Sequence, residues 1–168
     1  MTDKMAKIIT NLDLTPHPEG GYYRETYRSA GMINQNSLPP VFTGERNYST
    51  CIYFLLIAGS FSAFHRIVQD EIWHFYDGFP VILHLITPDG KYSNICIGRD
   101  IDKGESPQFV VPGGTWFASE VSALNEFSLV GCTVSPGFDF IDFELPGRKE
   151  LILKFPQLSE IITRLTKT

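Results

Sequence analysis

The sequence predicts an all-β fold of antiparallel strands with a short helix near each end of the chain. From Ser49 onward, short segments rich in Val, Ile, Phe, Tyr and Thr alternate with turns rich in Gly, Pro, Asp and Asn. No segment with a 3.6-residue apolar period interrupts them, so parallel βαβ folds are disfavoured. Regular short strands joined by turns are typical of an antiparallel sandwich or barrel.

The N-terminal region combines a short helix with a rigid turn. Apolar residues recur at helical spacing from Met5, which predicts an amphipathic helix ending near Asn11 and Leu12. Residues 16–29 read Pro-His-Pro-Glu-Gly-Gly-Tyr-Tyr-Arg-Glu-Thr-Tyr-Arg-Ser. The two prolines and the glycine pair predict a rigid turn that leads into a polar strand.

That polar strand has two interpretations. Its alternation places Arg24 and Arg28 on one face and Tyr23 and Glu25 on the other. A row of charged residues is common on an exposed edge strand with cross-strand ion pairs. In the second interpretation, Arg24 or Glu25 lines a pocket and contacts a polar ligand.

The rest of the chain contains a long loop, the main run of strands and a last helix. Residues 30–48 lack periodicity, which predicts a loop that serves as a lid or as a partner arm. After Pro156, apolar residues at helical spacing predict a final amphipathic helix. The expected strands cover residues 49–58, 61–67, 71–77, 81–86, 91–97, 107–111, 115–119, 126–134 and 138–145.

Composition limits the organisation and the partners. A chain of 168 residues is expected to form one domain, residues 1–168, with a full core. The net charge is -5 and the basic residues are scattered, so we expect no nucleic-acid partner. No apolar run has signal-peptide or bilayer-spanning length, which predicts a cytoplasmic protein that does not contact a membrane. The three cysteines lie far apart in apolar runs and are expected to be buried thiols.

Chemistry-bearing side chains gather in the stretch from Ser62 to Gly78. His65, Glu71 and His74 lie there within ten residues of otherwise apolar sequence. If the two halves of the stretch pair as strands, His65 and Glu71 meet inside the fold and His74 points away. Buried polar groups of this kind form either a satisfied structural network or a site.

Two segments resemble the motifs of the cupin superfamily. Its first motif, Gly-x5-His-x-His-x3,4-Glu-x6-Gly, is similar to the run from Gly59 to Gly78, with Ile67 in place of the second histidine. Its second motif is similar to the run around Pro112-Gly113-Gly114, with Phe117 where the last metal ligand would stand. The strings in residues 16–29 and 62–78 further resemble a functionally uncharacterised group of small cupins.

The resemblance implies a fold, and it also shows which ligands of the family's metal site this chain retains. It implies a cupin-type antiparallel jelly-roll barrel, similar to that of sugar epimerases. Cupins that use a catalytic metal hold it with three imidazoles and a carboxylate, of which only His65 and Glu71 remain here. Two protein ligands make a weak site for a divalent first-row ion, so we expect no metal and no cofactor.

The expected function is binding of a small polar metabolite in the barrel. Because related epimerases work without a metal, the resemblance suggests an epimerase-like or isomerase-like reaction on a sugar or carbonyl compound. His65 would be the base, oriented by Glu71. Tyr53, Tyr23 or Tyr76 would supply the acid.

Further side chains are expected to bind the ligand, and two alternative functions remain open. An arginine can bind a carboxylate or phosphate by a bidentate contact. The expected ligand-binding residues are Arg24, Glu25, Arg46, Trp73, Phe75 and Phe117. The alternatives are a non-catalytic small-molecule binder or sensor and a purely structural dimer module. A homodimer is expected, with residues 22–28 and 30–48 as candidate contacts.

Overall fold

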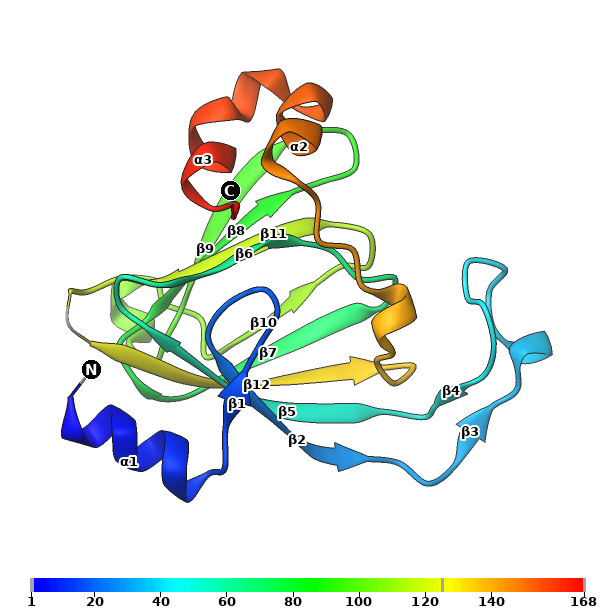
Figure 1. Cartoon of the computed structure of the whole chain (residues 1–168), viewed down its shortest axis with the longest axis horizontal. Coiled ribbons are helices and arrows are strands. Elements are labelled where there is room, and N and C mark those ends of the chain that lie inside the picture. Colours follow the sequence, from blue (N-terminus) through cyan, green and yellow to red (C-terminus); the bar gives the residue numbers. More distant parts are fainter. Residues whose placement is uncertain (1, 125, 168) are drawn as a thin grey trace.

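Two antiparallel sheets face each other in the structure, which is a computed structural model describing residues 2–124 and 126–167 (Figure 1). The six-stranded sheet has the order β1-β2-β5-β12-β7-β10, and the four-stranded sheet has the order β6-β11-β8-β9. This arrangement confirms the predicted antiparallel jelly roll. The strands of the first sheet are β1 (Thr15–Pro16), β2 (Tyr22–Arg28), β5 (Thr50–Ile57), β12 (Phe127–Ser135), β7 (Asp70–Gly78) and β10 (Gln108–Val111). Those of the second are β6 (Phe61–His65), β11 (Trp116–Val121), β8 (Val81–Ile86) and β9 (Tyr92–Ile97).

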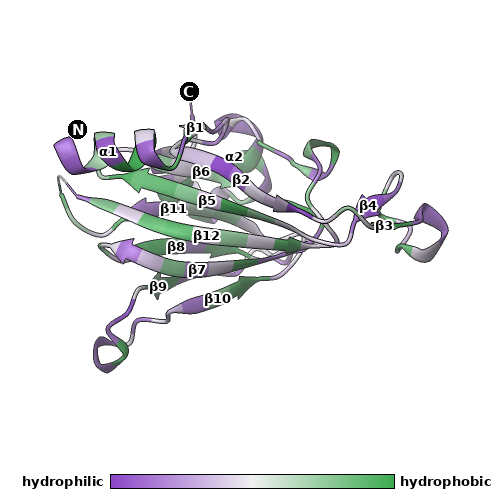
Figure 2. Ribbon diagram, turned by 90° about the horizontal axis from the view of Figure 1, so that it is seen from below, coloured by the Kyte–Doolittle hydropathy of each residue, from purple (hydrophilic) through white to green (hydrophobic). Residues whose placement is uncertain are grey.

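Apolar residues from both inner faces form the core between the sheets. Figure 2 shows that β5 and β12, at the centre of the larger sheet, are predominantly hydrophobic. Alternate residues of β5 and β7, such as Phe54 and Trp73, meet Leu83 and Phe117 of the smaller sheet in one buried cluster. Because the alternation of each strand sends every second side chain inward, this cluster follows directly from the sequence pattern.

Helices cover the outer faces. Helix α1 (Asp3–Asn11) begins at Thr2, whose side chain accepts a hydrogen bond from the Met5 amide, and it ends where the sequence predicts. Helices α2 (Arg148–Lys154) and α3 (Ser159–Arg164) pack on the smaller sheet. The predicted C-terminal helix is α3, whereas α2 was not predicted, because its seven residues are too few to display helical periodicity. Within the described residues, no helix is long and apolar enough to span a membrane.

The segment 138–145 is not a strand, so that prediction is wrong. It forms the 3-10 turn η3 (Phe140–Asp142), and the Asp139 side chain accepts a hydrogen bond of 2.9 Å from the Ile141 amide at its start. Such local bonds from aspartate compete with a strand ladder. Only Glu144 keeps a strand-like contact, through an isolated bridge to Arg66.

Residues 30–48 form an arm that projects away from the barrel (Figure 1). It contains the short pair β3 (Met32–Ile33) and β4 (Arg46–Asn47) and the 3-10 turn η1 (Gln35–Ser37). At its base, the Arg46 guanidinium donates to both carboxylate oxygens of Asp142, at 2.7 and 2.6 Å, in a buried ion pair. The arm is therefore anchored to the η3 turn.

A β-bulge changes the face of β2 partway along the strand. The register with β5 shifts between Glu25 and Tyr27, so the simple alternation predicted for this strand fails after Glu25. As a result, Arg28 comes to the same side as Tyr23 and Glu25, and all three side chains border one cavity. This shift decides which arginine reaches the site.

Candidate functional site

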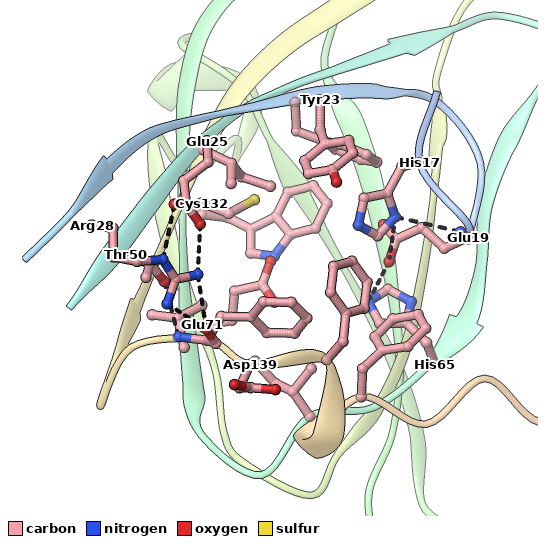
Figure 3. Close-up of a pocket in the computed structure, with 18 residues that line it drawn as sticks. His17, Glu19, Tyr23, Glu25, Arg28, Thr50, His65, Glu71, Cys132 and Asp139 are labelled. Atoms are coloured by element: carbon pink, nitrogen blue, oxygen red, sulfur yellow. Dashed lines mark hydrogen bonds and ion pairs between the residues drawn. The ribbon is translucent and has the colours of Figure 1, made fainter. Parts of the chain in front are cut away.

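A cavity of about 460 Å³ lies inside the barrel, beside the apolar core (Figure 3). Its walls are mainly aromatic and aliphatic, and its polar side chains converge from β2, β5, β6, β7, β12 and two turns. A cavity of this size fits a small metabolite. The lining residues are His17, Glu19, Tyr23, Glu25, Arg28, Thr50, Ile52, Phe54, His65, Ile67, Glu71, Trp73, Cys132, Val134, Phe138, Asp139, Phe140 and Phe143.

The turn between β1 and β2 carries Glu19 into the barrel. Its backbone packs directly on β6, because the Ala63 amide donates to the Glu19 carbonyl at 2.9 Å. Gly20 has a φ of +125°, and a Cβ at this position would collide with the carbonyl oxygen of Phe61. Only glycine allows this close approach. The Ser62 hydroxyl then donates to Oε1 of Glu19 at 2.8 Å.

Glu19 is the ion-pair partner of His65. Nε2 of His65 lies 3.0 Å from Oε2 of Glu19, and Nδ1 lies 2.7 Å from the Ala63 carbonyl oxygen. Since both ring nitrogens face acceptors, the ring carries two protons and a positive charge. Burial opposes this charge, but the charge and hydrogen bond of Glu19 raise the pKa of His65. Burial likewise opposes the charge on Glu19, but His65, His17 and Ser62 lower the pKa of that carboxyl.

The expected pairing of His65 with Glu71 differs from this geometry. The two halves of the stretch 62–78 do not pair as strands, because β6 bonds to β11 while β7 bonds to β10 and β12. Both side chains still line the same cavity. With both ring nitrogens engaged, His65 has no free lone pair with which to act as a base.

Glu71 is the ionisable group of the cavity that titrates near neutrality. Burial raises its pKa to about 7; the charge of His65 opposes the rise, and that of Glu19 adds to it. Hydrogen bonding from the side chains of Cys132 and Trp73 lowers its pKa. The contact from Trp73 is a loose one, since its buried indole N–H makes no hydrogen bond of good geometry among the described residues. A carboxylate can accept up to about four hydrogen bonds, so Glu71 keeps bonding capacity for a ligand.

His17 presents a neutral ring to the cavity. Burial lowers its pKa, although Glu19 opposes the shift. Nδ1 of His17 lies 3.4 Å from the Glu19 amide and 3.5 Å from Oε2 of Glu19, and we assign the tautomer in which the amide donates to Nδ1 and the ring proton is on Nε2. Figure 3 shows that Nε2 lies on the cavity side of the ring, and the hydroxyl of Tyr23 lies nearby. His17 is therefore an uncharged donor, and more than the turn residue that its two flanking prolines indicate.

Arg28 and Glu25 stand at the open end of the cavity. Nε and Nη2 of Arg28 donate to the two carboxylate oxygens of Glu25 at 2.9 and 2.7 Å. Nη1 donates to the Asn47 side chain at 2.8 Å, and both Nη1 and Nη2 donate to the Phe138 carbonyl, at 3.2 and 3.1 Å. These contacts account for all five N–H groups of the guanidinium. They also hold the segment after β12, with Asp139, over the cavity.

The remaining predicted ligand-binding residues divide between the cavity and other places. Glu25 and Trp73 line the cavity, while Phe75 and Phe117 belong to the apolar core beside it. The ring of Phe117 packs 4.0 Å, centroid to centroid, from that of His65.

The two expected arginines and the expected catalytic tyrosine lie outside the cavity. Arg24 is exposed and donates to the Leu12 carbonyl at 3.2 Å, and Arg46 is bound to Asp142. Tyr53 lies on the outer face of the larger sheet, where it packs beside Tyr76. Tyr23 is the one of the three expected tyrosines that lines the cavity.

The other histidines are hydrogen-bonded on the outer faces of the sheets. Nε2 of His74 lies 3.1 Å from the Thr133 hydroxyl, so His74 points away from the cavity, in agreement with its strand parity. His84 contacts the Tyr92 hydroxyl at 2.8 Å and the Glu120 carboxylate at 3.1 Å.

The residues present do not fit the metal centre that the cupin motifs imply. Ile67 lines the cavity where a histidine ligand would stand, and Phe117 is part of the core. In residues 2–124 and 126–167, no group of three or more His, Cys, Asp or Glu side chains is arranged to hold a metal ion. Fewer than three such donors make a weak site for a first-row metal.

Sequence reasoning missed several of the lining residues. Glu19 lies in a proline- and glycine-rich turn, and its position before Gly20-Gly21 was the available signal for a backbone that approaches another element closely. Arg28 depends on the bulge and Cys132 on the pairing of β12, neither of which the pattern reveals. The aromatic residues after Gly137 were expected to form a strand.

Comparisons with known proteins agree with this architecture. Residues 6–146 match the family model described as Cupin superfamily (DUF985). The Uncharacterized protein YML079W of Saccharomyces cerevisiae is 36% identical over 159 residues, covering 88% of this chain and 78% of the yeast protein. A hypothetical protein from Leishmania major has a TM-score of 0.88 and 35% identity over the full length of both chains. Protein SO0799 from Shewanella oneidensis has a TM-score of 0.85 and 40% identity over 96% of each chain.

A more distant likeness extends to oxalate decarboxylase from Bacillus subtilis. One such structure has a TM-score of 0.53 and 17% identity, covering 89% of this chain and 36% of the decarboxylase. At that identity the likeness concerns the fold alone.

Proposed function

Because this chain belongs to the Cupin superfamily (DUF985), we propose that its barrel cavity binds a small polar metabolite and transfers a proton on it without a metal. The observation that carries the proposal is Glu71, which is 9% exposed, lines the cavity and has a pKa raised by burial to about 7. A general acid or base works best when its pKa lies near the working pH. Glu71 therefore replaces His65 as the proton-transfer group.

The proposed step is an enolisation. The Glu71 carboxylate takes a proton from a hydroxyl-bearing carbon next to a carbonyl; the C–H electron pair forms a carbon–carbon double bond, and the π pair of the carbonyl moves to its oxygen. The Nε2–H of His17 donates a hydrogen bond to that oxygen as its negative charge develops. Glu71 then returns the proton to the former carbonyl carbon, and the proton of the neighbouring hydroxyl passes to the first oxygen, so the carbonyl group moves to the adjacent carbon and the isomerisation is complete.

For an epimerisation, Tyr23 is the proposed proton donor. Inversion at one carbon requires a proton donor on the opposite face of the substrate from the base. Tyr23 lines the cavity from β2, while Glu71 enters from β7. His65 takes no proton in either reaction; its positive charge favours the ionised form of Glu71, while the negative charge of Glu19 opposes it.

Deuterium incorporation tests the reaction. The wild-type protein is incubated in D₂O with a panel of aldoses, ketoses and amino sugars, and loss of C–H signals next to the carbonyl is followed by NMR. We expect exchange in at least one compound and a loss of about 100-fold or more in Glu71→Gln. Glu144→Gln, which removes an exposed carboxylate outside the cavity, should exchange normally. Equal rates in Glu71→Gln and wild type would refute the role of Glu71.

A non-catalytic binding protein is the second candidate. It is favoured by the saturation of His65 and Arg28, whose N–H groups are all engaged by the protein itself. The same panel separates the two functions, because a binder shifts its thermal unfolding with a ligand and incorporates no deuterium into it.

We also propose a homodimer in which the arm, residues 30–48, contacts a second copy. The arm leaves the barrel with Met32, Val41 and Tyr48 exposed by 42, 61 and 56%. Exposed apolar side chains on a projecting segment are typical of a partner contact. Light scattering should give twice the 19.0 kDa mass of one chain. A mass of 19.0 kDa at micromolar concentration would contradict the dimer.

A further inference from the structure

The cations of the cavity have no N–H group left for a ligand. Arg28 and His65 are the two cationic side chains that line it, since His17 is neutral. The five N–H groups of Arg28 are engaged by Glu25, Asn47 and the Phe138 carbonyl. The two N–H groups of His65 are engaged by Glu19 and the Ala63 carbonyl. A phosphate or carboxylate entering the cavity would find no free charged donor.

Acidic groups outnumber these cations. Glu19, Glu25, Glu71 and Asp139 line the cavity, against two positive charges. Glu19 and Glu25 are each paired with one cation, which leaves Glu71 on the inner wall and Asp139 at the exposed end. Glu71 is more than nine-tenths buried, and the indole N–H beside it is without a partner among the described residues. The groups inside the cavity that can still bond to a ligand are therefore an acidic acceptor, Glu71, and uncharged N–H donors.

Aromatic rings line the cavity that holds this acidic group. Trp73 lies beside Glu71, and Phe54, Phe138, Phe140 and Phe143 belong to the same lining. The rings of Phe54 and Trp73 meet edge to face, 5.9 Å between centroids. The negative faces of aromatic rings attract organic cations, most strongly where water is excluded.

We propose that the ligand of this cavity is a small organic cation whose ammonium or amidinium group is held by Glu71 within the aromatic wall. The inference rests on the proposed binding function, narrows its ligand class, and goes with the non-catalytic candidate, because a Glu71 carboxylate paired with an ammonium group is not free to take a proton from carbon. A carbonyl or hydroxyl oxygen of the same molecule meets the uncharged donors of His17 and Trp73. An amine-bearing sugar or amino ketone has both features, whereas phosphorylated sugars, nucleotides and carboxylic acids are rejected.

Titration calorimetry at pH 7 with two sets of matched probes tests the charge preference. One set is glucosamine, glucose and glucuronate, and the other is benzylamine, benzyl alcohol and benzoate. In each set that binds, we expect the amine to bind at least tenfold more tightly than the neutral probe, and the anion to bind most weakly. The Glu71→Gln variant should lose the preference for the amine, and Glu144→Gln should keep it.

The number of protons released when the amine binds is a second measurement, and it needs no variant. His65 from β6, Glu19 from the β1–β2 turn and Cys132 from β12 face Glu71. A cation bound beside Glu71 favours its ionised form, so benzylamine, whose ammonium group stays charged up to pH 8, should release protons on binding at pH 7 and bind more tightly as the pH rises to 8. Calorimetry in two buffers of different ionisation enthalpy measures that release.

The outcomes separate the two proposals. If the neutral probe or the anion binds as tightly as the amine, the cation preference is overturned and the binding function survives. If no probe of either set binds, both proposals fail. Amine binding without proton release, or with full affinity in Glu71→Gln, would overturn the contact with Glu71.

Discussion

Nε2 of His65 lies 3.0 Å from Oε2 of Glu19, inside a barrel that also holds Glu71. This contact determines the division of roles in the cavity. It makes His65 a fixed cation with no free lone pair, because the Ala63 carbonyl occupies its other nitrogen. Glu71, with no cation bonded to it directly, becomes the group whose charge changes near neutral pH.

The Glu19→Gln variant should be strongly destabilised. It leaves the buried His65 without its counter-charge, and breaking a buried pair on one side costs about 3 to 5 kcal/mol. The pKa of His65 should fall at the same time, because the raising effect of Glu19 is lost. Urea unfolding measures the first effect and NMR titration of the His65 ring the second.

The matched control is Glu144→Gln, whose partly exposed pair with Arg66 should contribute no more than about 1 kcal/mol. Equal losses in both variants would contradict the buried charge pair.

The pair of Glu19 and His65 should also make the stability of the protein depend on pH. Its full contribution is expected above the unfolded-state pKa of glutamate and below that of histidine, and it declines outside that window.

The Glu71→Gln variant should be more stable than the wild type at pH 8. The native state holds the Glu71 proton up to pH about 7, whereas the unfolded chain releases it near the model value of 4.5. Between those values the unfolded state binds fewer protons, so wild-type stability falls as the pH rises. Gln avoids the buried charge and should gain at most about 3 kcal/mol at pH 8.

Urea unfolding of this variant and the wild type at pH 4 and pH 8 provides the measurement. The two proteins should have nearly the same free energy of unfolding at pH 4, where the wild-type side chain is protonated. A variant that is less stable than the wild type at pH 8 would show that the native protein prefers the charged carboxylate.

The Gly20→Ala variant should lose stability and disturb the position of Glu19. The added methyl group meets the Phe61 carbonyl oxygen, and the φ of +125° is one that L side chains rarely adopt. Gly104→Ala is the control, since its φ of +80° is also positive but nothing lies within 4 Å of the added atom. Gly104→Ala should cost about 1 kcal/mol, and Gly20→Ala clearly more. Equal midpoints in urea would argue against the close approach.

Replacement of Arg46 should affect stability, with no direct effect on the cavity. Arg46→Ala leaves Asp142 buried without its cation, with an expected loss of about 3 to 5 kcal/mol. Arg24→Ala, at an exposed site, should change stability by no more than about 0.5 kcal/mol. Thermal unfolding of both variants decides the point, and a similar small shift in each would mean that the Asp142 pair contributes little.

Local patterns account for most of the correct predictions. Alternation in β5, β7 and β8 and helical spacing in α1 indicate the elements, because side-chain direction depends on the position along one strand or helix. The motifs from Gly59 to Gly78 and around Gly113 then indicate the cupin fold. Strand alternation also placed His65, Glu71 and Trp73 on inward faces, and all three are buried in the structure.

By itself, the sequence determined most of the strands and the terminal helices, and its likeness to the cupin motifs indicated the loss of two metal ligands at Ile67 and Phe117. The tertiary structure alone decided that Glu19 reaches His65 and that Arg28, and not Arg24, faces the cavity. The physical reason is that these contacts depend on a turn packed against a distant strand and on a one-residue bulge. Neither leaves a periodic trace in the chain, and a shift of one residue moves a side chain to the opposite face of a sheet.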